Sequence, residues 1–295
     1  MLEFKKLELE HIPLVEKYLI KTSSEICDVT IGGIFIWRDL FKSEYALYDD
    51  MLFFKVIYLR NEIAFSTPMA DDKIKAIEVL KIYCKNNGLP FIMCTITEKL
   101  LVQFKEYYKI KKVIEERDWF DYFYLSKDLI NFTGKKYSTQ RNNINKFKRM
   151  YSDNNFEKIN NSNLKDIKDF FLKYSSNIDT KANKIILEDT IKTHEVLDNY
   201  TLYNFVGGVL YVYNEVVGFV IGEIRGDVFF IHIEKGNSKY KGVYQVLVNE
   251  VCRMFCEDIK YVNREDDSGE IGMRESKLRY RPIKLLEKLT VYFDE

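Results

Sequence analysis

The run VVGFVIGEIR-GD-VFFIHIE, from Val216 to Glu234, predicts a β-hairpin of two long strands. Gly226 and Asp227 form the turn, and glycine at the first central position favours a two-residue type II′ turn. That turn sets the register, and residues pair on one face as Arg225 with Val228, Glu223 with Phe230, Ile221 with His232 and Phe219 with Glu234. The opposite face is apolar and is predicted to lie in the core.

Glu223 and His232 become diagonal neighbours on the less apolar face of this hairpin. A carboxylate and an imidazole at that spacing are able to share a proton with each other or with a substrate. We therefore take both as candidate catalytic residues. The alternative is a structural histidine whose hydrogen bonds are satisfied under a packed helix.

The segment after the hairpin, Asn237 to Gln245, leads into an amphipathic helix predicted at Val243–Asp258. A strand, a glycine-containing basic loop and a helix N-terminus together offer free backbone N–H groups and the positive end of the helix dipole to an anion. An ordinary turn has the same sequence features. The candidate cofactor-binding residues are Tyr240, Lys241, Gly242, Tyr244 and Gln245.

A second polar segment, Asn263 to Pro282, follows a predicted strand at Lys260–Asn263. Its mixture of acids, bases and glycines packs poorly and suits a loop that carries binding groups. We take Asp266 as a candidate catalytic residue, and the candidate substrate-binding residues are Arg264, Glu265, Arg274, Lys277 and Tyr280. The alternative is a salt-bridged structural loop. No H-x-x-x-H or clustered Asp-x-Asp pattern is present, so no metal site is predicted.

The strongest local charge bias lies in a predicted helix at Lys135–Tyr151. Between Gly134 and Arg149 the chain has six basic residues and no acidic one. Such a helix can hold a phosphate-bearing group, and a solvated helix face is the alternative. The candidate substrate-binding residues here are Lys135, Lys136, Arg141, Asn142, Asn145 and Lys146.

The two halves of the chain show similar element orders. Each has helices, an antiparallel meander, a helix, a strand, another helix and a final strand. The predicted strands include Lys112–Leu125, Leu202–Tyr213 and Leu285–Phe293. The sequence therefore predicts an α+β (mixed α/β) fold of two domains, residues 1–127 and 128–295, each a mostly antiparallel mixed sheet flanked by helices.

The composition restricts the class of protein. In 295 residues, 45 Lys and Arg balance 45 Asp and Glu, so the whole surface does not attract nucleic acid or anionic membrane. The N-terminus lacks the apolar region of a signal peptide, and no transmembrane segment is predicted. Five cysteines without a C-x-x-C pair indicate reduced, buried thiols and a cytoplasmic protein.

Three motifs together resemble a known bacterial family. They are G-K-K-Y-x-x-x-R-N-x-I-N-K-F from Gly134, E-K-G-N-x-x-Y-K-G-x-Y-Q from Glu234 and N-R-E-D-D-x-G-x-x-G-x-R-x-x-K-x-x-Y-x-P from Asn263. In this order and spacing they resemble proteins grouped with the C-terminal domain of phosphatidylglycerol lysyltransferase. The resemblance implies two tandem GNAT-like (acetyltransferase-type) domains related to the Fem-type aminoacyl transferases.

The resemblance also suggests a reaction. We expect an acyl- or aminoacyl-transferase that needs no fixed cofactor and takes its group from acyl-CoA or aminoacyl-tRNA. The acceptor would be an amine or hydroxyl of a small molecule, lipid headgroup or peptide. In GNAT domains the loop before the long helix binds the CoA pyrophosphate through a Gly-x-Gly pattern. Here one glycine remains and Tyr244 stands where a small residue is expected, which argues against ordinary acetyl-CoA use.

The C-terminal domain is predicted to hold the site, with the N-terminal domain as scaffold, because residues 1–125 show no comparable polar group. Two alternatives stay open. One is a non-catalytic ligand-binding module that keeps the transferase fold. The other is an RNA-binding protein that uses the Lys135–Arg149 helix.

Overall fold

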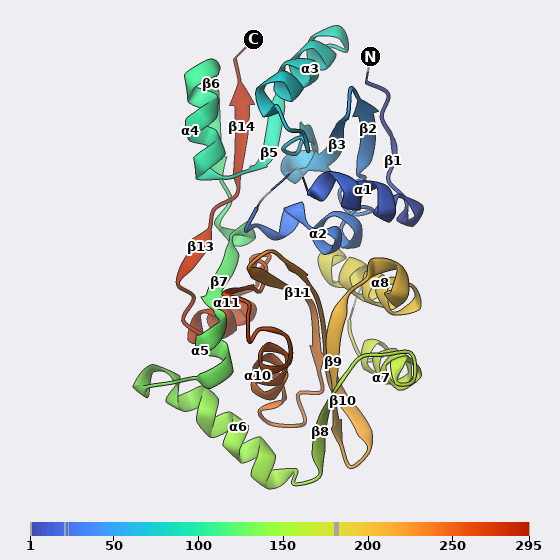
Figure 1. Cartoon of the computed structure of the whole chain (residues 1–295), viewed down its shortest axis with the longest axis vertical. Coiled ribbons are helices and arrows are strands. Elements are labelled where there is room, and N and C mark those ends of the chain that lie inside the picture. Colours follow the sequence, from blue (N-terminus) through green and yellow to red (C-terminus); the bar gives the residue numbers. More distant parts are fainter. Residues whose placement is uncertain (1, 21, 23, 180–182, 295) are drawn as a thin grey trace. The chain divides into compact units, whose positions relative to one another are not determined.

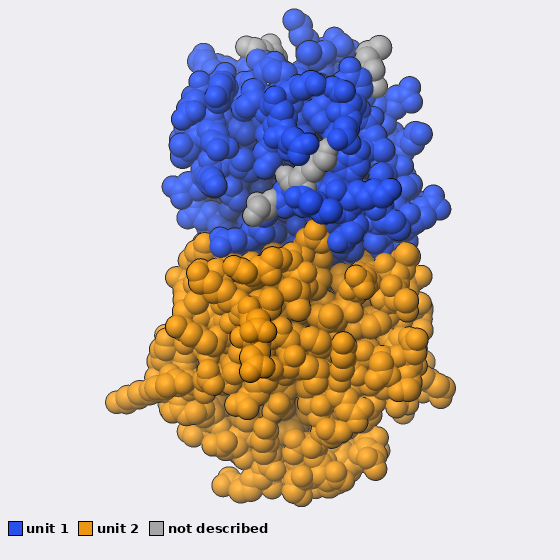
Figure 2. Space-filling model, in the orientation of Figure 1, with its two compact units in different colours: residues 1–121, 266–269, 286–295 blue, residues 122–265, 270–285 orange. Residues whose placement is uncertain are grey.

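The computed structural model describes residues 2–20, 22, 24–179 and 183–294 (Figure 1). The chain forms two compact units (Figure 2). Unit 1 comprises Met1–Asp121, Asp266–Gly269 and Leu286–Glu295, and unit 2 comprises Tyr122–Glu265 and Glu270–Leu285. The chain therefore leaves unit 1 a few residues before the predicted boundary and returns to it twice.

Unit 1 is built on a seven-stranded sheet in the order β1-β2-β3-β4-β5-β14-β6. Only β4 and β5 pair in parallel among the described neighbours. The strands are β1 (Lys5–Lys6), β2 (Glu44–Tyr48), β3 (Met51–Tyr58), β4 (Glu62–Phe65), β5 (Ile92–Ile96), β6 (Ile110–Glu115) and β14 (Leu289–Phe293). The α-helices are α1 (Ile12–Leu19), α2 (Ile31–Ile36), α3 (Lys73–Asn86) and α4 (Glu98–Tyr107).

Unit 2 is built on a second seven-stranded sheet in the order β13-β7-β12-β11-β10-β9-β8. Its strands are β7 (Asp121–Leu125), β8 (Asn154–Lys158), β9 (Val206–Val212), β10 (Glu215–Arg225), β11 (Val228–Gly236), β12 (Tyr261–Asn263) and β13 (Lys284–Leu286). Its helices are α5 (Ser126–Asn131), α6 (Ser138–Met150), α7 (Leu164–Ser175), α8 (Lys184–Asp198), α9 (Tyr200–Tyr203), α10 (Val243–Phe255) and α11 (Ile271–Arg279).

Helices cover both faces of the unit 2 sheet. On one face Val220 of β10 packs in a buried cluster with Leu247 of α10. On the other face the ring of Phe219 lies 5.9 Å from that of Phe171 in α7. Neighbouring residues of β10 thus enter two different layers, as the alternation of side chains along a strand requires.

The predicted fold class, a mixed α/β fold with two mixed sheets flanked by helices, is confirmed. All five cysteines are free and buried, as predicted. In the described part of the chain, no helix combines the length and the apolar character needed to cross a membrane.

Three predicted strands are wrong in their extent. Lys112–Leu125 is split into β6 and β7 by a 3₁₀ turn at Arg117–Trp119, and Leu285–Phe293 is split into β13 and β14, so that each pair contributes to both sheets. Leu202–Tyr213 begins as helix α9, which ends at Asn204 in the left-handed conformation that often terminates helices. The sequence prediction also missed α5, α11 and β8.

The hairpin of β10 and β11 depends on a close approach at Gly222. A Cβ atom built there would lie 2.0 Å from the carbonyl oxygen of Phe230. We expect Gly222→Ala to lower the free energy of unfolding by about 2–3 kcal/mol, because the backbone must move to admit the methyl group. Chemical denaturation measures the change.

Gly272 is the matched control, since a Cβ atom there meets no atom within 4 Å. Gly272→Ala should leave stability within about 0.5 kcal/mol of the wild type or raise it slightly. Equal stabilities for the two variants would contradict the close approach at Gly222.

Candidate functional site

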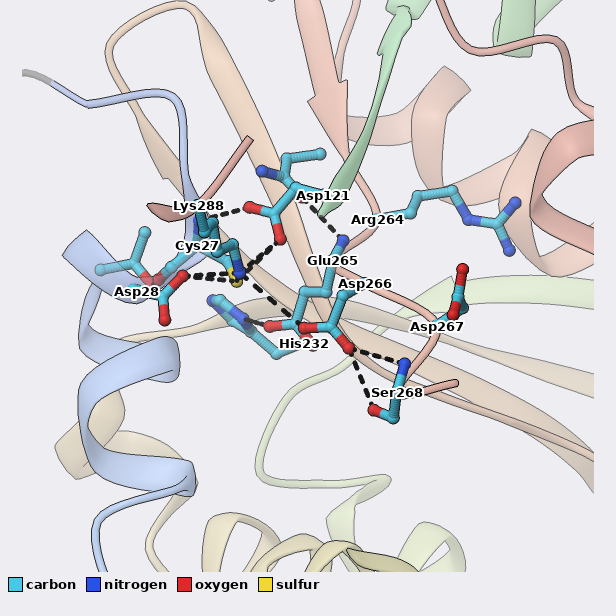
Figure 3. A network of polar contacts seen from close by, with 12 residues as sticks. Cys27, Asp28, Asp121, His232, Arg264, Glu265, Asp266, Asp267, Ser268 and Lys288 are labelled. Carbon is cyan, nitrogen blue, oxygen red and sulfur yellow. Dashed lines mark hydrogen bonds and ion pairs between the residues drawn. The ribbon is translucent and has the colours of Figure 1, made fainter. Parts of the chain in front are cut away.

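His232 lies between two carboxylates in unit 2. Its Nε2 is 2.9 Å from Oε1 of Glu223. Its Nδ1 is 2.7 Å from Oε1 of Glu265 (Figure 3). The imidazole has no exposed surface, whereas the side chains of Glu223 and Glu265 are 8% and 14% exposed. We call these three residues the imidazole cluster.

An irregularity in the pairing of β10 with β11 determines where the side chain of His232 lies in the imidazole cluster. Arg225 pairs with Val228 and Glu223 with Phe230, as predicted. The predicted pairing of Ile221 with His232 is wrong, because the register shifts between Ile221 and Gly222 and Ile221 pairs with Ile233. A bulge of this kind re-aims a side chain, and here it leaves His232 outside the ladder.

Phe219 also differs from its predicted register, because it pairs with Lys235 and not with Glu234. The shift follows from the same bulge, since one extra residue of β11 moves every later pair by one position. The predicted proximity of Glu223 and His232 is present nonetheless, because the shift begins only beyond Glu223.

Glu265 is the member that the sequence did not connect with the histidine. It follows β12, which pairs in parallel with β11 only from Tyr261 to Asn263. The side chain of Asn263 accepts a hydrogen bond of 2.7 Å from the backbone N–H of Glu265, which has a left-handed φ of 54°. This local turn directs the carboxylate to His232.

The electrostatics of the cluster favour a protonated imidazole. Burial disfavours the charge, but the hydrogen bonds and charges of Glu223 and Glu265 outweigh it and raise the pKa of His232 to about 9. At neutral pH the ring then donates from both nitrogens and has no lone pair to accept a proton. The cluster thus offers carboxylate oxygens, rather than the imidazole, as proton acceptors.

A second buried ion pair bridges β11 and the end of β12. Nη2 of Arg264 donates to Oε2 of Glu234 over 2.8 Å, and the guanidinium lies 4.4 Å from the ring centroid of Tyr280. Lys277 donates to the carbonyl oxygen of Arg264 over 2.6 Å. Of these predicted substrate-binding residues, Arg264 and Tyr280 are buried, whereas Lys277 and Arg274 lie half-buried on α11.

The loop before α10 is covered by α6. A Cβ atom at Gly242, whose φ is 95°, would lie 2.7 Å from the carbonyl oxygen of Asn143. The hydroxyl of Tyr244 donates to the carbonyl oxygen of Gly236 over 3.0 Å. The backbone N–H of Val246 donates to the carbonyl oxygen of Gly242 over 3.1 Å, as in any α-helix. The space beside this glycine is filled by protein, while Lys241 is exposed and Gln245 is half-buried.

The predicted cations of α6 and the 3₁₀ turn before it divide into two groups. Lys136 pairs with Asp128 at 3.3 Å, Lys148 pairs with Glu250 at 2.7 Å, and Arg141 donates to the carbonyl oxygen of Gly134. These three cations are engaged within the protein. The cations that have no ion pair in the described part of the chain are Lys135, Lys146 and Arg149, and they are exposed, as are Asn142 and Asn145.

Asp266, predicted as catalytic, belongs to unit 1 and to a different cluster. The ammonium of Lys288 lies 2.6 Å from Asp28, 2.7 Å from Asp121 and 3.8 Å from Asp266 (Figure 3). It also donates to Sγ of Cys27 over 3.2 Å. Burial disfavours its charge, but Asp121 and Asp28 outweigh it and raise the pKa of Lys288 well above its ordinary value. We call this group the lysine cluster.

Cys27, Asp28 and Asp121 are ligand types that metal ions use, and their ligand atoms lie within 4.8 Å of one another. The ammonium of Lys288 bonds to all three. The lysine therefore supplies the positive charge that these groups require.

The fold defines a mixed α/β protein of two units, each built on a seven-stranded sheet. Residues 22–292 match the family described as phosphatidylglycerol lysyltransferase, C-terminal, and the chain belongs to this family. The predicted resemblance is confirmed.

Individual relatives are distant in sequence. An uncharacterized protein of Mycoplasmoides gallisepticum is 24% identical over 175 residues, which cover 58% of this chain and 55% of that protein, so the match spans about half of the relative. The crystal structure of a conserved protein of unknown function from Bacteroides thetaiotaomicron has a TM-score of 0.90 to this chain. The two proteins are 25% identical in sequence, and the match covers 100% of each chain. L-PGS from Bacillus licheniformis is 13% identical over 95% of this chain and 91% of its own, and its TM-score of 0.66 shows the shared fold.

The imidazole cluster predicts a pH-dependent stability. The pKa of His232 is higher in the folded protein, about 9, than the ordinary value of 6.5. Its contribution is therefore complete below pH 6.5 and lost as the pH rises through 9, a loss of about 3 kcal/mol. Urea unfolding from pH 6 to 10 should show this loss in the wild type, and the His232→Gln variant should lack it. The same pH dependence in both proteins would contradict the assignment.

The lysine cluster predicts a large effect of removing one charge. Lys288→Met leaves buried carboxylates without their cation and should lower the free energy of unfolding by about 3–5 kcal/mol. Lys109→Met is the control, because Lys109 is 84% exposed and pairs with Asp294 at the surface, where a pair contributes about 0–1 kcal/mol. Denaturant unfolding measures the free energy of unfolding of both variants. A similarly small loss in the two would show that Lys288 does not neutralise the buried carboxylates.

Proposed function

We propose that the chain is an aminoacyltransferase whose reaction is carried out at the imidazole cluster of unit 2. The observation that carries the proposal is the geometry of the buried imidazole of His232, whose two nitrogens lie within hydrogen-bonding distance of Glu223 and Glu265. Membership of the phosphatidylglycerol lysyltransferase C-terminal family supports transfer of an activated group as the class of reaction.

Glu265 is the proposed proton acceptor. One of its oxygens is fixed by the imidazolium, its second oxygen is bonded to no residue in the described part of the chain, and it is the most exposed of the three side chains. A carboxylate in this position removes the proton of an attacking hydroxyl or amine. His232 acts as a positioning residue that fixes Glu265 and balances its charge.

The proposed step needs no reactant other than the acceptor and the aminoacyl donor. The acceptor O–H or N–H bond breaks, a bond forms from the acceptor atom to the acyl carbon, and the ester bond to the carrier breaks. The proton passes through Glu265 to the departing carrier oxygen. The protein therefore ends the cycle in its starting protonation state.

The loop before α10 favours an aminoacyl ester over acyl-CoA as the donor. The carbonyl of Asn143 lies against Gly242, and the hydroxyl of Tyr244 bonds to Gly236. A pyrophosphate held by backbone N–H groups needs open space at that glycine. The proposed donor is accordingly aminoacyl-tRNA, and the proposed acceptor is a hydroxyl such as that of the phosphatidylglycerol headgroup.

The test is transfer of a labelled amino acid from charged tRNA to phosphatidylglycerol vesicles. We expect Glu265→Gln to lower the rate of transfer at least about 100-fold, the usual contribution of a general base. Glu157→Gln is the matched control on β8, at the edge of the sheet away from β12, and should keep the wild-type rate. Undiminished transfer by Glu265→Gln would remove Glu265 from the proposed role, and binding of the donor without product would favour the non-catalytic module.

A further inference from the structure

Cys27 and Lys288 form a contact between a sulfur and an amine that the proposed transfer reaction does not use. Nζ of Lys288 donates to Sγ of Cys27 over 3.2 Å (Figure 3). Both residues are buried and belong to unit 1, where Cys27 opens the 3₁₀ turn at Cys27–Val29 and Lys288 directly precedes β14. Two chemically reactive side chains from distant parts of the sequence are therefore held at contact distance in the interior.

Neighbouring groups hold both side chains in this contact. The backbone N–H of Cys27 donates to Oδ2 of Asp121 over 2.7 Å, and Oδ1 of the same carboxylate lies 2.7 Å from Nζ of Lys288. A Cβ atom at Gly33 of α2 would lie 2.0 Å from the carbonyl oxygen of Cys27, so α2 packs tightly against the backbone of the cysteine. The sulfur and the nitrogen therefore have little room to separate, which keeps them in a geometry suited to reaction.

The other four cysteines lack such a partner. In the described part of the chain, the hydrogen bond from Lys288 to Cys27 is the only one between a lysine and a cysteine. Burial raises the pKa of Cys84 to about 12, so its thiol stays protonated and unreactive. Cys27 differs because a cation lies beside its sulfur and Asp121, 3.3 Å away, accepts its S–H group. An adjacent cation favours the thiolate, which is the oxidisable form of cysteine.

We propose that Cys27 and Lys288 are a site of reversible oxidation, at which dioxygen links the two side chains through a covalent N–O–S bridge. The O–O bond of dioxygen, the S–H bond and two N–H bonds of the ammonium break, and one S–O and one N–O bond form. The second oxygen atom leaves as water with two of the hydrogens, and the third hydrogen passes as a proton to a carboxylate such as that of Asp121. Sulfur and nitrogen each lose two electrons, and dioxygen accepts four.

A single inserted oxygen atom fits the observed contact. An N–O–S bridge places nitrogen and sulfur only slightly closer together than they lie now, whereas a direct S–N bond would need a much larger movement of both side chains. The bridge also preserves the net charge of the lysine cluster, because one protonated carboxylate offsets the lost cation. Burial of Cys27 limits the access of larger oxidants than dioxygen, and this favours one product over the sulfinic and sulfonic acids.

The test compares wild-type protein kept under nitrogen with the same protein equilibrated in air-saturated buffer. Each sample is denatured, its free thiols are alkylated, and a chymotryptic digest is analysed by mass spectrometry. We expect a cross-linked pair of peptides that contain Cys27 and Lys288, with a mass equal to their sum plus one oxygen atom minus two hydrogen atoms. The bridge should be absent under nitrogen, heavier after exposure to isotopically heavy dioxygen, and cleaved by dithiothreitol.

Two variants provide a matched comparison. Cys27→Ala should form no bridge, whereas Cys84→Ala should form it at the wild-type yield, and each variant removes one buried thiol of unit 1. Because Lys288→Met is expected to destabilise the protein, the fragment spectra of the wild-type peptides identify the lysine instead. The folded wild type should give at least about 10-fold more bridge than the urea-unfolded chain in the same air, since the contact raises the effective concentration of the amine at the sulfur.

A folded, air-exposed wild type in which Cys27 stays fully open to alkylation after denaturation would overturn the proposal. Recovery of Cys27 as a disulfide or a sulfinic acid in place of the bridge would do the same, as would an equal yield of bridge in the unfolded chain. These outcomes do not depend on the proposed transfer reaction, because no residue of the imidazole cluster takes part in the oxidation.

Discussion

The arrangement of unit 2 depends on a buried positive charge that two strands and a loop must neutralise together. An imidazolium without exposed surface is tolerated in a protein interior only where hydrogen-bonded anions surround it. Glu223 comes from β10, His232 from the bulge in β11, and Glu265 from the turn after β12. The pairing of these three strands, the close approach at Gly222 and the left-handed turn at Glu265 are therefore parts of one constraint. A site of this kind is rigid, because each group fixes the others.

Unit 1 also contains a buried positive charge, the ammonium group of Lys288. The charge of Lys288 is balanced by Asp28, Asp121 and, at a longer distance, Asp266, and these residues come from four separate segments of the chain. The cluster holds the short connection between β13 and β14 where the chain passes to the sheet of unit 1. Its contribution is therefore to the architecture, since it fixes the segment from which the last strand of that sheet begins.

Local patterns account for what the sequence could predict. Alternating residues and the Gly226-Asp227 turn placed Glu223 near His232, and helical spacing identified α6 and α10. Glu265 could not be connected with His232, because a bulge and a turn after a three-residue parallel pairing leave no periodic signal. The lysine cluster unites groups up to 261 positions apart, as between Cys27 and Lys288. The sequence feature that could have indicated this cluster is a single charged residue in an apolar run, such as Asp121 within WFDYFY.

The proposed role of Glu265 depends on the protonation state of His232, which NMR measures directly. The nitrogen and proton chemical shifts of the imidazole, followed from pH 6 to 10 in protein labelled at histidine, report whether both ring nitrogens carry protons. We expect a ring that is doubly protonated through pH 8 and titrates near pH 9. A neutral ring at pH 7, with one bare nitrogen, would contradict it and return the role of proton acceptor to the histidine.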